Sequence, residues 1–211
     1  MLREHARIAG DRIELRGPVD HGANVRRAGE DARKGECVLR AGQPLGPAQV
    51  ALAASLGIER LAVSARPTVA VFTTGDELVE PGIALQPGQI YNSNRELLMG
   101  LLRAEGLEPM AWPTLPDDPA RMGSMLADAA ASFDLVLTCG GVSAGEKDHL
   151  PALLQAHGHV HFWKVRMKPG MPLLAGAWDR AQFLGLPGNP VSVLATWLTL
   201  GRGLVEGLQG R

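Results

Sequence analysis

The stretch DLVLTCGGVSAGEKDHLPALLQAHG at residues 134–158 decides the fold, because a glycine-rich turn joins an apolar run to a second apolar segment. The run 134–138 is continuous, as is typical of a strand that is buried on both faces of a sheet. The segment 149–158 has the length and apolar content of a helix. A strand followed directly by a helix is the repeating unit of parallel sheets, so we predict an α/β fold.

The same alternation extends outward over residues 67–211. Strands are predicted at 67–72, 108–115, 159–165, 172–178 and 181–186, and helices at 94–106, 117–133 and 189–208. Asn94 and Asp118 are the expected N-caps, with Pro119 at the first helical position. This pattern predicts a mostly parallel sheet with helices on both faces.

Residues 1–66 form a different region by composition. Short strands are predicted at 5–15, 35–45 and 60–65, and a helix at 47–58 that Gly57 ends. The opening strand has no obvious partner, and few large apolar side chains are available for burial. We therefore expect a partial β-rich region that is weak as a free domain.

Charge and cysteine content exclude several classes of function. The 211 residues include 21 basic and 22 acidic side chains, a formal net charge of −1, which argues against general nucleic-acid binding. No apolar run approaches a membrane span, and the opening residues are too charged for a signal peptide. Cys37 and Cys139 are far apart, so we expect a reducing cytoplasm and a small buried role for Cys139 rather than nucleophilic chemistry.

Three polar turns follow apolar runs and nominate a ligand site. They are TTGDEL at 73–78, CGGVSAGEKDH at 139–149 and LPGNP at 186–190. Ligands of open α/β sheets bind at the carboxyl ends of the strands, where these turns are expected to lie. The predicted ligand is a phosphate or another oxyanion, together with a divalent metal ion.

The middle turn carries the strongest chemical signal. Gly140, Gly141 and Gly145 allow the backbone to approach a ligand closely, and the N–H groups of 142–145 precede a helix, where an anion is favoured. A tight turn with glycines for packing alone is the alternative. Nearby acids decide between them, because carboxylates beside a phosphate require a hard cation such as Mg²⁺.

Those acids are Asp76 and Glu77 in the first turn, Asp148 after the middle turn, and Asp117 with Asp118 at the end of another strand. Helix capping and solvated turns are their alternative roles, which suit Asp118 better than Glu77 or Asp148.

Basic side chains and histidines are ambiguous by spacing alone. Lys164 and Lys168 lie four apart, so a strand would place both on one face to hold a compact oxyanion, whereas a solvated edge strand is the alternative. The segment RRAGED at 26–31 could be a solvated turn or could reach a neighbouring subunit. The histidines at 157, 159 and 161 show no metal spacing, and we expect structural or solvent roles for them.

Seven segments together resemble one known family. They are NVRRAGED, TTGDEL, GQIYNSN, PDDP, CGGVSAGEKD, FWKVRMKPGMP and GLPGNPVS. In order and spacing they are similar to the molybdopterin molybdenumtransferases of MoeA and gephyrin E-domain type. The resemblance implies a three-layer molybdopterin-binding domain at 67–211, preceded at 1–66 by part of the family's β-rich regions. The N-terminal segment and C-terminal β-domain of full-length members have no counterpart in this sequence.

The resemblance also implies a reaction, in which adenylylated molybdopterin and molybdate are substrates, Mg²⁺ assists, and AMP is released. The implied catalytic residues are Glu77, Asp148, Lys164 and Lys168, of which Glu77 and Asp148 hold the metal. The implied cofactor-binding residues are Thr74, Gly75, Asp76, Asp117, Gly140, Gly141, Val142, Ser143, Gly145, Pro187, Pro190, Arg26 and Asp31. The resemblance further implies a cytoplasmic homodimer, with the molybdopterin adenylyltransferase as a further partner.

One departure from the family pattern concerns Met171, which stands where the family often has a third lysine. Two alternatives stay open at this point. One is the sister activity, molybdopterin adenylyltransferase, against which the RRAGED segment and the LPGNP turn argue. The other is a non-catalytic module that binds molybdopterin or a protein partner.

Overall fold

The computed structural model describes residues 6–15, 17–143, 145 and 148–210. The chain divides into two compact units, Met1–Glu59 and Arg60–Arg211. The sequence prediction placed the division between residues 66 and 67. None of the helices in the described part of the chain is long and apolar enough to cross a membrane.

The first unit contains a hairpin and one helix. Strands β1 (Ala6–Ala9) and β2 (Arg12–Leu15) pair antiparallel across a turn at Gly10, whose φ is +61°. The prediction that the opening strand lacks a partner was therefore wrong, because this turn folds the segment 6–15 onto itself. Helix α1 (Pro47–Ser55) was predicted.

Two of the predicted strands do not form. Residues 35–45 and 60–65 are described and contain no strand. No described strand pairs with the segment 60–65, and Val63 there is 68% exposed, so its side chain has no core to pack against. Apolar residues of β-type alone do not make a strand, because its backbone groups need a partner.

The second unit is built on a sheet of six strands in the order β6-β3-β7-β10-β9-β8. Their bounds are β3 Val69–Thr73, β6 Met110–Ala111, β7 Leu135–Cys139, β8 His159–Trp163, β9 Leu174–Trp178 and β10 Ala181–Leu186. The first four in sheet order are parallel, while β9 is antiparallel to both β10 and β8. Consequently β8 runs in the direction of β10, and the carboxyl ends of β3, β7, β10 and β8 share one edge.

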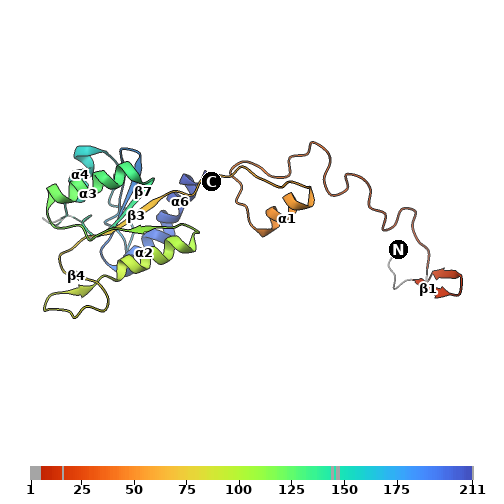
Figure 1. The fold of residues 1–211 in the computed structure, drawn as a ribbon, viewed down its shortest axis with the longest axis horizontal. Helices are drawn as coiled ribbons and strands as arrows, with labels where there is room; N and C mark the ends of the chain where they lie inside the picture. Colours follow the sequence, from red (N-terminus) through yellow and green to blue (C-terminus); the bar gives the residue numbers. More distant parts are fainter. Residues whose placement is uncertain (1–5, 16, 144, 146–147, 211) are drawn as a thin grey trace. The chain divides into compact units, whose positions relative to one another are not determined.

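Helices cover both faces of this sheet (Figure 1). They are α2 Ser93–Ala104, α3 Pro119–Ser132, α4 Leu150–His157, α5 Pro190–Thr196 and α6 Arg202–Leu208. One buried cluster includes Leu98 of α2 and Trp197, and the other includes Leu126 of α3 and Leu154 of α4. Two apolar clusters on opposite faces of one sheet make three layers, so the predicted three-layer, mostly parallel α/β fold is confirmed.

Several local details differ from the sequence prediction. The N-cap of α2 is Asn92, whose Oδ1 accepts from the Arg95 N–H at 3.4 Å, rather than Asn94. Asp118 caps α3 as predicted. The final long helix is interrupted by a π-helical turn, Trp197–Gly201, between α5 and α6. A two-residue parallel pair, β4 (Leu78–Val79) with β5 (Ile90–Tyr91), was not predicted.

Candidate active site

The three predicted turns lie side by side at the carboxyl edge of the sheet. The Thr74 N–H donates to the Cys139 carbonyl at 3.0 Å, and the Gly140 N–H donates to the Leu186 carbonyl at 3.0 Å. Strands β3, β7 and β10 therefore end at the same level, and each turn begins beside the next. The prediction that these segments are loops at strand ends is confirmed.

A cavity of about 260 Å³ opens at this edge. It is lined by predicted site residues from all of the nominated segments: Thr74, Gly75, Glu77, Asp117, Gly140, Gly141, Asp148 and Pro190. It is also lined by Leu78, Cys139 and Gly188, which lie in the nominated turns but were not named as site residues. The residues that sequence reasoning missed are Ile90, Tyr91, Asn92, Ser93 and Asn94.

The remaining predicted site residues of the second unit do not line this cavity. Asp76, Ser143, Gly145, Lys164 and Lys168 are exposed, whereas Val142 and Pro187 are buried. Ala144, Glu146 and Lys147 of the predicted anion-binding turn lie outside the described residues.

The first turn depends on a glycine. Gly75 has a φ of +126°, and a Cβ on it would lie 2.4 Å from Oε2 of Glu77. The Glu77 carboxylate thus folds back over the turn, where only a residue without a side chain leaves room. The Glu77 carbonyl accepts from the Ile90 N–H at 2.9 Å, which fixes the start of the excursion 78–91.

The middle turn also has two left-handed glycines. Gly140 and Gly141 have φ values of +90° and +70°, and a Cβ on Gly140 would lie 2.4 Å from Thr74 Oγ1. That hydroxyl donates to the Cys139 carbonyl at 3.3 Å. The glycines therefore let the first and middle turns approach each other.

Asp148 closes the end of the middle turn. Its Oδ2 accepts from the Gly145 N–H at 2.8 Å, and its own N–H donates to the Gly145 carbonyl at 3.0 Å. The carboxylate thus has the turn role that the sequence left open, and it also lines the cavity. For the second carboxylate oxygen, no hydrogen bond to another described residue is seen.

The cavity is acidic, since Glu77, Asp117 and Asp148 all line it. Among the described residues, no group of three or more acidic, histidine or cysteine side chains could hold a metal ion. Mg²⁺ is commonly held by one or two carboxylates and completes its shell with phosphate oxygens and water. Glu77 and Asp148 are two carboxylates of this type that line one cavity.

Cys139 lines the cavity but is not suited to nucleophilic attack. Only 2% of the residue is exposed, and burial raises the pKa of its thiol to about 12. At neutral pH the thiolate is therefore scarce, which confirms the predicted small buried role.

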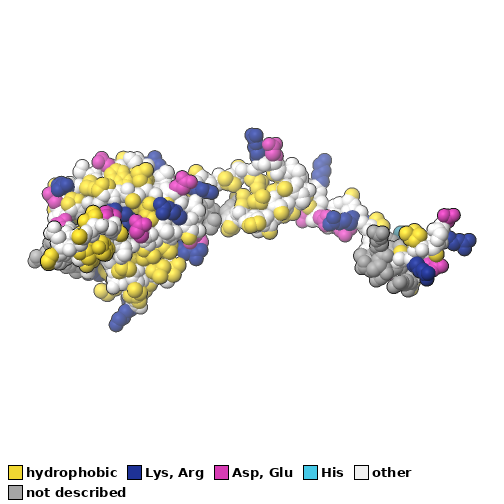
Figure 2. Space-filling model, turned by 60° about the horizontal axis from the view of Figure 1, so that its bottom comes forward, with side chains coloured by type: hydrophobic (Ala, Val, Ile, Leu, Met, Phe, Trp, Pro, Cys, Tyr) yellow, Lys and Arg dark blue, Asp and Glu magenta, His cyan; other side chains and the backbone are white. Residues whose placement is uncertain are grey.

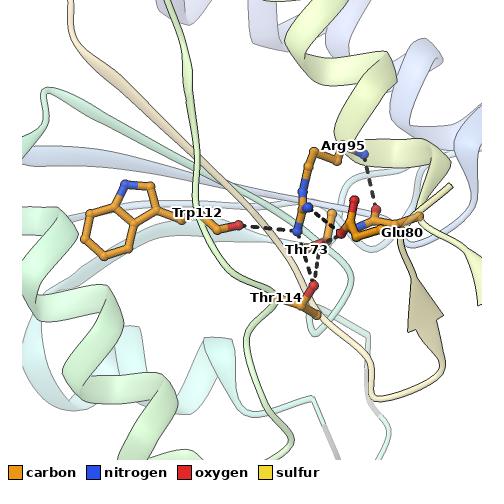
Figure 3. A network of polar contacts seen from close by, with 6 residues as sticks. Thr73, Glu80, Arg95, Trp112 and Thr114 are labelled. Atoms are coloured by element: carbon orange, nitrogen blue, oxygen red, sulfur yellow. Dashed lines mark hydrogen bonds and ion pairs between the residues drawn. The ribbon is translucent and has the colours of Figure 1, made fainter. Parts of the chain in front are cut away.

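Arg95 connects the segments that carry the cavity residues (Figure 3). Its guanidinium pairs with Glu80 and donates to the Trp112 carbonyl and to Thr114 Oγ1, each at 3.3 Å. Thr114 Oγ1 lies 3.4 Å from Thr73 Oγ1. The Thr73 hydroxyl in turn accepts from Asn92 Nδ2 at 2.8 Å. The network ties the ends of β3 and β6 to the start of α2.

Asn94 makes a second link across the cavity, since its Nδ2 donates to the Gly188 carbonyl at 2.6 Å. Both Asn94 and Arg95 lie in or next to the quoted GQIYNSN motif, which was the one available signal for them. Their partners are up to 94 residues away in sequence, so spacing could not have revealed the contacts.

Lys164 and Lys168 follow β8 rather than lying in it. The strand ends at Trp163, and Lys164 adopts a left-handed φ of +68°. The expectation that a strand places both lysines on one face was therefore wrong, because the backbone turns at the first of them. The Lys164 ammonium lies over the Trp163 ring, 4.6 Å from its centroid.

Arg26 and Asp31 belong to the first unit and pair with each other at 2.7 Å, with side chains 77% and 70% exposed.

The three closely spaced histidines make contacts with aromatic or imidazole rings. The ring of His157 stacks on Trp178 with 5.0 Å between ring centroids, and His159 contacts His161 edge to face. The face drawn in Figure 2 shows basic side chains interspersed with acidic ones.

Comparison with known proteins identifies the family. Residues 70–206 match the family model of the probable molybdopterin binding domain, and residues 2–57 match the MoeA N-terminal region (domain I and II). The molybdopterin molybdenumtransferase of Haemophilus influenzae is 45% identical over 188 residues, which cover 89% of this chain and 46% of that protein. Molybdopterin molybdenumtransferase 2 of Mycobacterium tuberculosis is 41% identical over 194 residues, covering 89% and 48%.

Solved structures give the same picture. The molybdopterin biosynthesis MoeA protein of Pyrococcus horikoshii aligns with a TM-score of 0.75 and 30% identity, over 99% of this chain and 52% of that one. The MoaB structure from Thermus thermophilus, with a TM-score of 0.51 and 21% identity, shares the fold over 69% of this chain. The chain spans about half the length of the curated relatives it matches. Because its family model matches residues 70–206, the chain belongs to the family of the probable molybdopterin binding domain, and its residues 2–57 also match the MoeA N-terminal region.

Proposed function

We propose that this chain takes part in molybdenum cofactor biosynthesis, where it binds adenylylated molybdopterin and molybdate and inserts the metal with release of AMP. One observation carries the proposal. Three carboxylates and three left-handed glycines from three separate segments line a single cavity at the carboxyl edge of the sheet. This is where α/β folds bind ligands, and the combination suits a phosphate ester held beside a cation.

In this proposal Glu77 and Asp148 hold Mg²⁺, which would neutralise charge on the phosphoanhydride oxygens. The open backbone at Gly140 and Gly141 lets the phosphate approach the turn. Thr74, Asp76, Asp117 and the turn around Pro187 and Pro190 contact the pterin nucleotide.

Lys164 and Lys168 are proposed to hold molybdate and to stabilise the leaving phosphate, since both residues are exposed. The exposed pair of Arg26 and Asp31 is proposed to serve the site of a second copy in a homodimer. A molybdopterin adenylyltransferase would supply the substrate, and the cytoplasm is the proposed compartment.

The test measures binding and turnover separately. The chain is titrated with AMP and with adenylylated molybdopterin in the presence and absence of Mg²⁺, and AMP release is then followed after molybdate is added. We expect Mg²⁺ to bind only with a phosphate-bearing ligand, because the two carboxylates leave most of its shell unfilled.

The variant Glu77→Gln should lose this ligand-dependent Mg²⁺ binding. Its matched control is Glu96→Gln, which changes an exposed carboxylate of α2 that does not line the cavity. Equal Mg²⁺ affinity in Glu77→Gln and the parent chain would remove Glu77 from the metal site. Failure of the parent chain to bind either nucleotide would overturn the proposed function.

A further inference from the structure

Trp163 connects two parts of the site that are far apart in sequence. It is the last residue of β8 and pairs with Leu174, which pairs in turn with Gly185 of β10. Gly185 is aligned with Thr138 of β7. Trp163 is therefore aligned across the sheet with Thr138, the residue immediately before the middle turn.

The indole N–H of Trp163 donates to the Val142 carbonyl at 2.8 Å. Val142 is 1% exposed, and its side chain fills the space beside Gly185, where a Cβ would meet Val142 Cγ1 at 2.4 Å. The middle turn is thus fixed at Val142 by a hydrogen bond to its carbonyl and by packing of its side chain beside Gly185. Because the C=O and N–H of a trans peptide point in opposite directions, a Val142 carbonyl directed at Trp163 directs the Ser143 N–H away from it.

The face of the same indole holds a cation. Lys164 Nζ lies 4.6 Å from the centroid of the Trp163 ring, within the range of a cation–π contact. The Lys164 backbone has a φ of +68°, which L-residues rarely adopt, and its N–H donates to the Leu173 carbonyl at 2.8 Å. Such backbone conformations cluster at ligand sites, where the surroundings must enforce them.

We propose that Trp163 is a positioning residue, which orients the Ser143 N–H through its indole N–H and the Lys164 ammonium through its ring face. In this proposal, each of the two electropositive groups is available to an oxyanion bound at the middle turn. This inference rests on the proposed function and names a residue that acts through others, since Trp163 itself makes no contact with the anion.

Two substitutions separate the contributions of Trp163. Trp163→Phe keeps a ring face for Lys164 but removes the indole donor, whereas Trp163→Leu removes both. We expect Trp163→Phe to weaken molybdate or AMP binding roughly 2- to 10-fold, the effect of one lost hydrogen bond. Trp163→Leu should weaken it further.

Trp178→Phe is the matched control. Like Trp163, Trp178 packs against the apolar cluster that contains Leu126 and Leu154. It differs in position, because antiparallel β9 ends at the opposite end of the strands from the cavity, where Trp178 stacks on His157. It should change thermal stability without changing anion affinity.

A double-mutant cycle distinguishes positioning from packing. Lys164→Met should cost less affinity in the Trp163→Leu chain than in the parent chain, because the ammonium is no longer held there. Additive losses, or equal anion affinity of Trp163→Phe and the parent chain, would overturn the inference. If Trp163→Leu fails to fold, Trp163→Phe alone decides.

Calorimetric titration with sodium molybdate and with AMP gives the affinities, and a melting curve accompanies each variant. A parent chain that binds these ligands while Trp163→Phe binds them equally well leaves the proposed function intact and refutes only the role of Trp163. A parent chain that binds neither refutes both.

Discussion

Replacing Gly140 by alanine tests the geometry on which the cavity depends. The residue has a φ of +90°, and the new Cβ would lie 2.4 Å from Thr74 Oγ1 and 3.4 Å from the Thr74 carbonyl. A left-handed conformation costs an L-residue about 1–2 kcal/mol. Thr74 has a short side chain that cannot move aside as a flexible one would, so overpacking adds about 1–3 kcal/mol.

The expected loss of unfolding free energy is therefore about 2–5 kcal/mol. For a unit of this size it corresponds to a fall in melting temperature on the order of 5–15 °C, measured by calorimetry or circular dichroism. Gly100→Ala is the control, because Gly100 is exposed in α2 and a Cβ there meets nothing within 4 Å. It should gain about 0.5–1 kcal/mol.

A second substitution divides the loss into its two causes. In a Thr74→Ala chain the hydroxyl is gone, so Gly140→Ala should cost only the conformational part, about 1–2 kcal/mol. An equal melting temperature for Gly140→Ala and the parent chain would show that the left-handed turn and its close approach to Thr74 do not exist as described. The cavity geometry built on them would then be refuted.

Three further substitutions test individual side chains. Lys164→Gly should weaken molybdate binding in a titration while leaving the melting temperature unchanged or raised, because glycine adopts a φ of +68° without strain; a large fall in melting temperature would contradict this. Lys168→Ala should weaken anion binding with little change in melting temperature, since the side chain is exposed, and the reverse result would favour a packing role. Hydrogen bonds from Thr68 and Arg180 lower the pKa of Asp134, so its stabilising effect is present above the ordinary carboxyl range and is lost as pH falls through the lowered pKa. Asp134→Asn should therefore melt below the parent at pH 7 and approach it below about pH 4, and a gap that widens in acid would refute the assignment.

The fold was predictable where a segment's own pattern determines its environment. Strands β3 and β7 are buried at every position, and their continuous apolar runs indicated this directly. The segment 60–65 has a similar apolar content but no strand beside it, so its prediction failed. Burial of a strand depends on neighbours that are distant in sequence, and composition alone does not report them.

The site was predictable to the extent that its residues come from the strand ends themselves. Glu77, Asp117 and Asp148 were identified because each follows an apolar run or its turn. Tyr91 and Asn94 were missed, because they reach the cavity only after the excursion 78–91 returns through the pairing of β4 with β5. Two residues in each strand leave no period to detect, so this return could be found only in three dimensions.

The lysine segment shows how an identified residue can be placed for the wrong reason. Spacing favoured Lys164 and Lys168 as partners on one strand face, but β8 ends at Trp163 and the chain turns at Lys164. The consequence is chemical as well as geometric. A lysine on a strand face would be oriented by the sheet, whereas Lys164 is oriented by the ring of Trp163, the same side chain that holds the Val142 carbonyl. Anion affinity at this edge should therefore respond to changes in the aromatic residue as well as in the lysine.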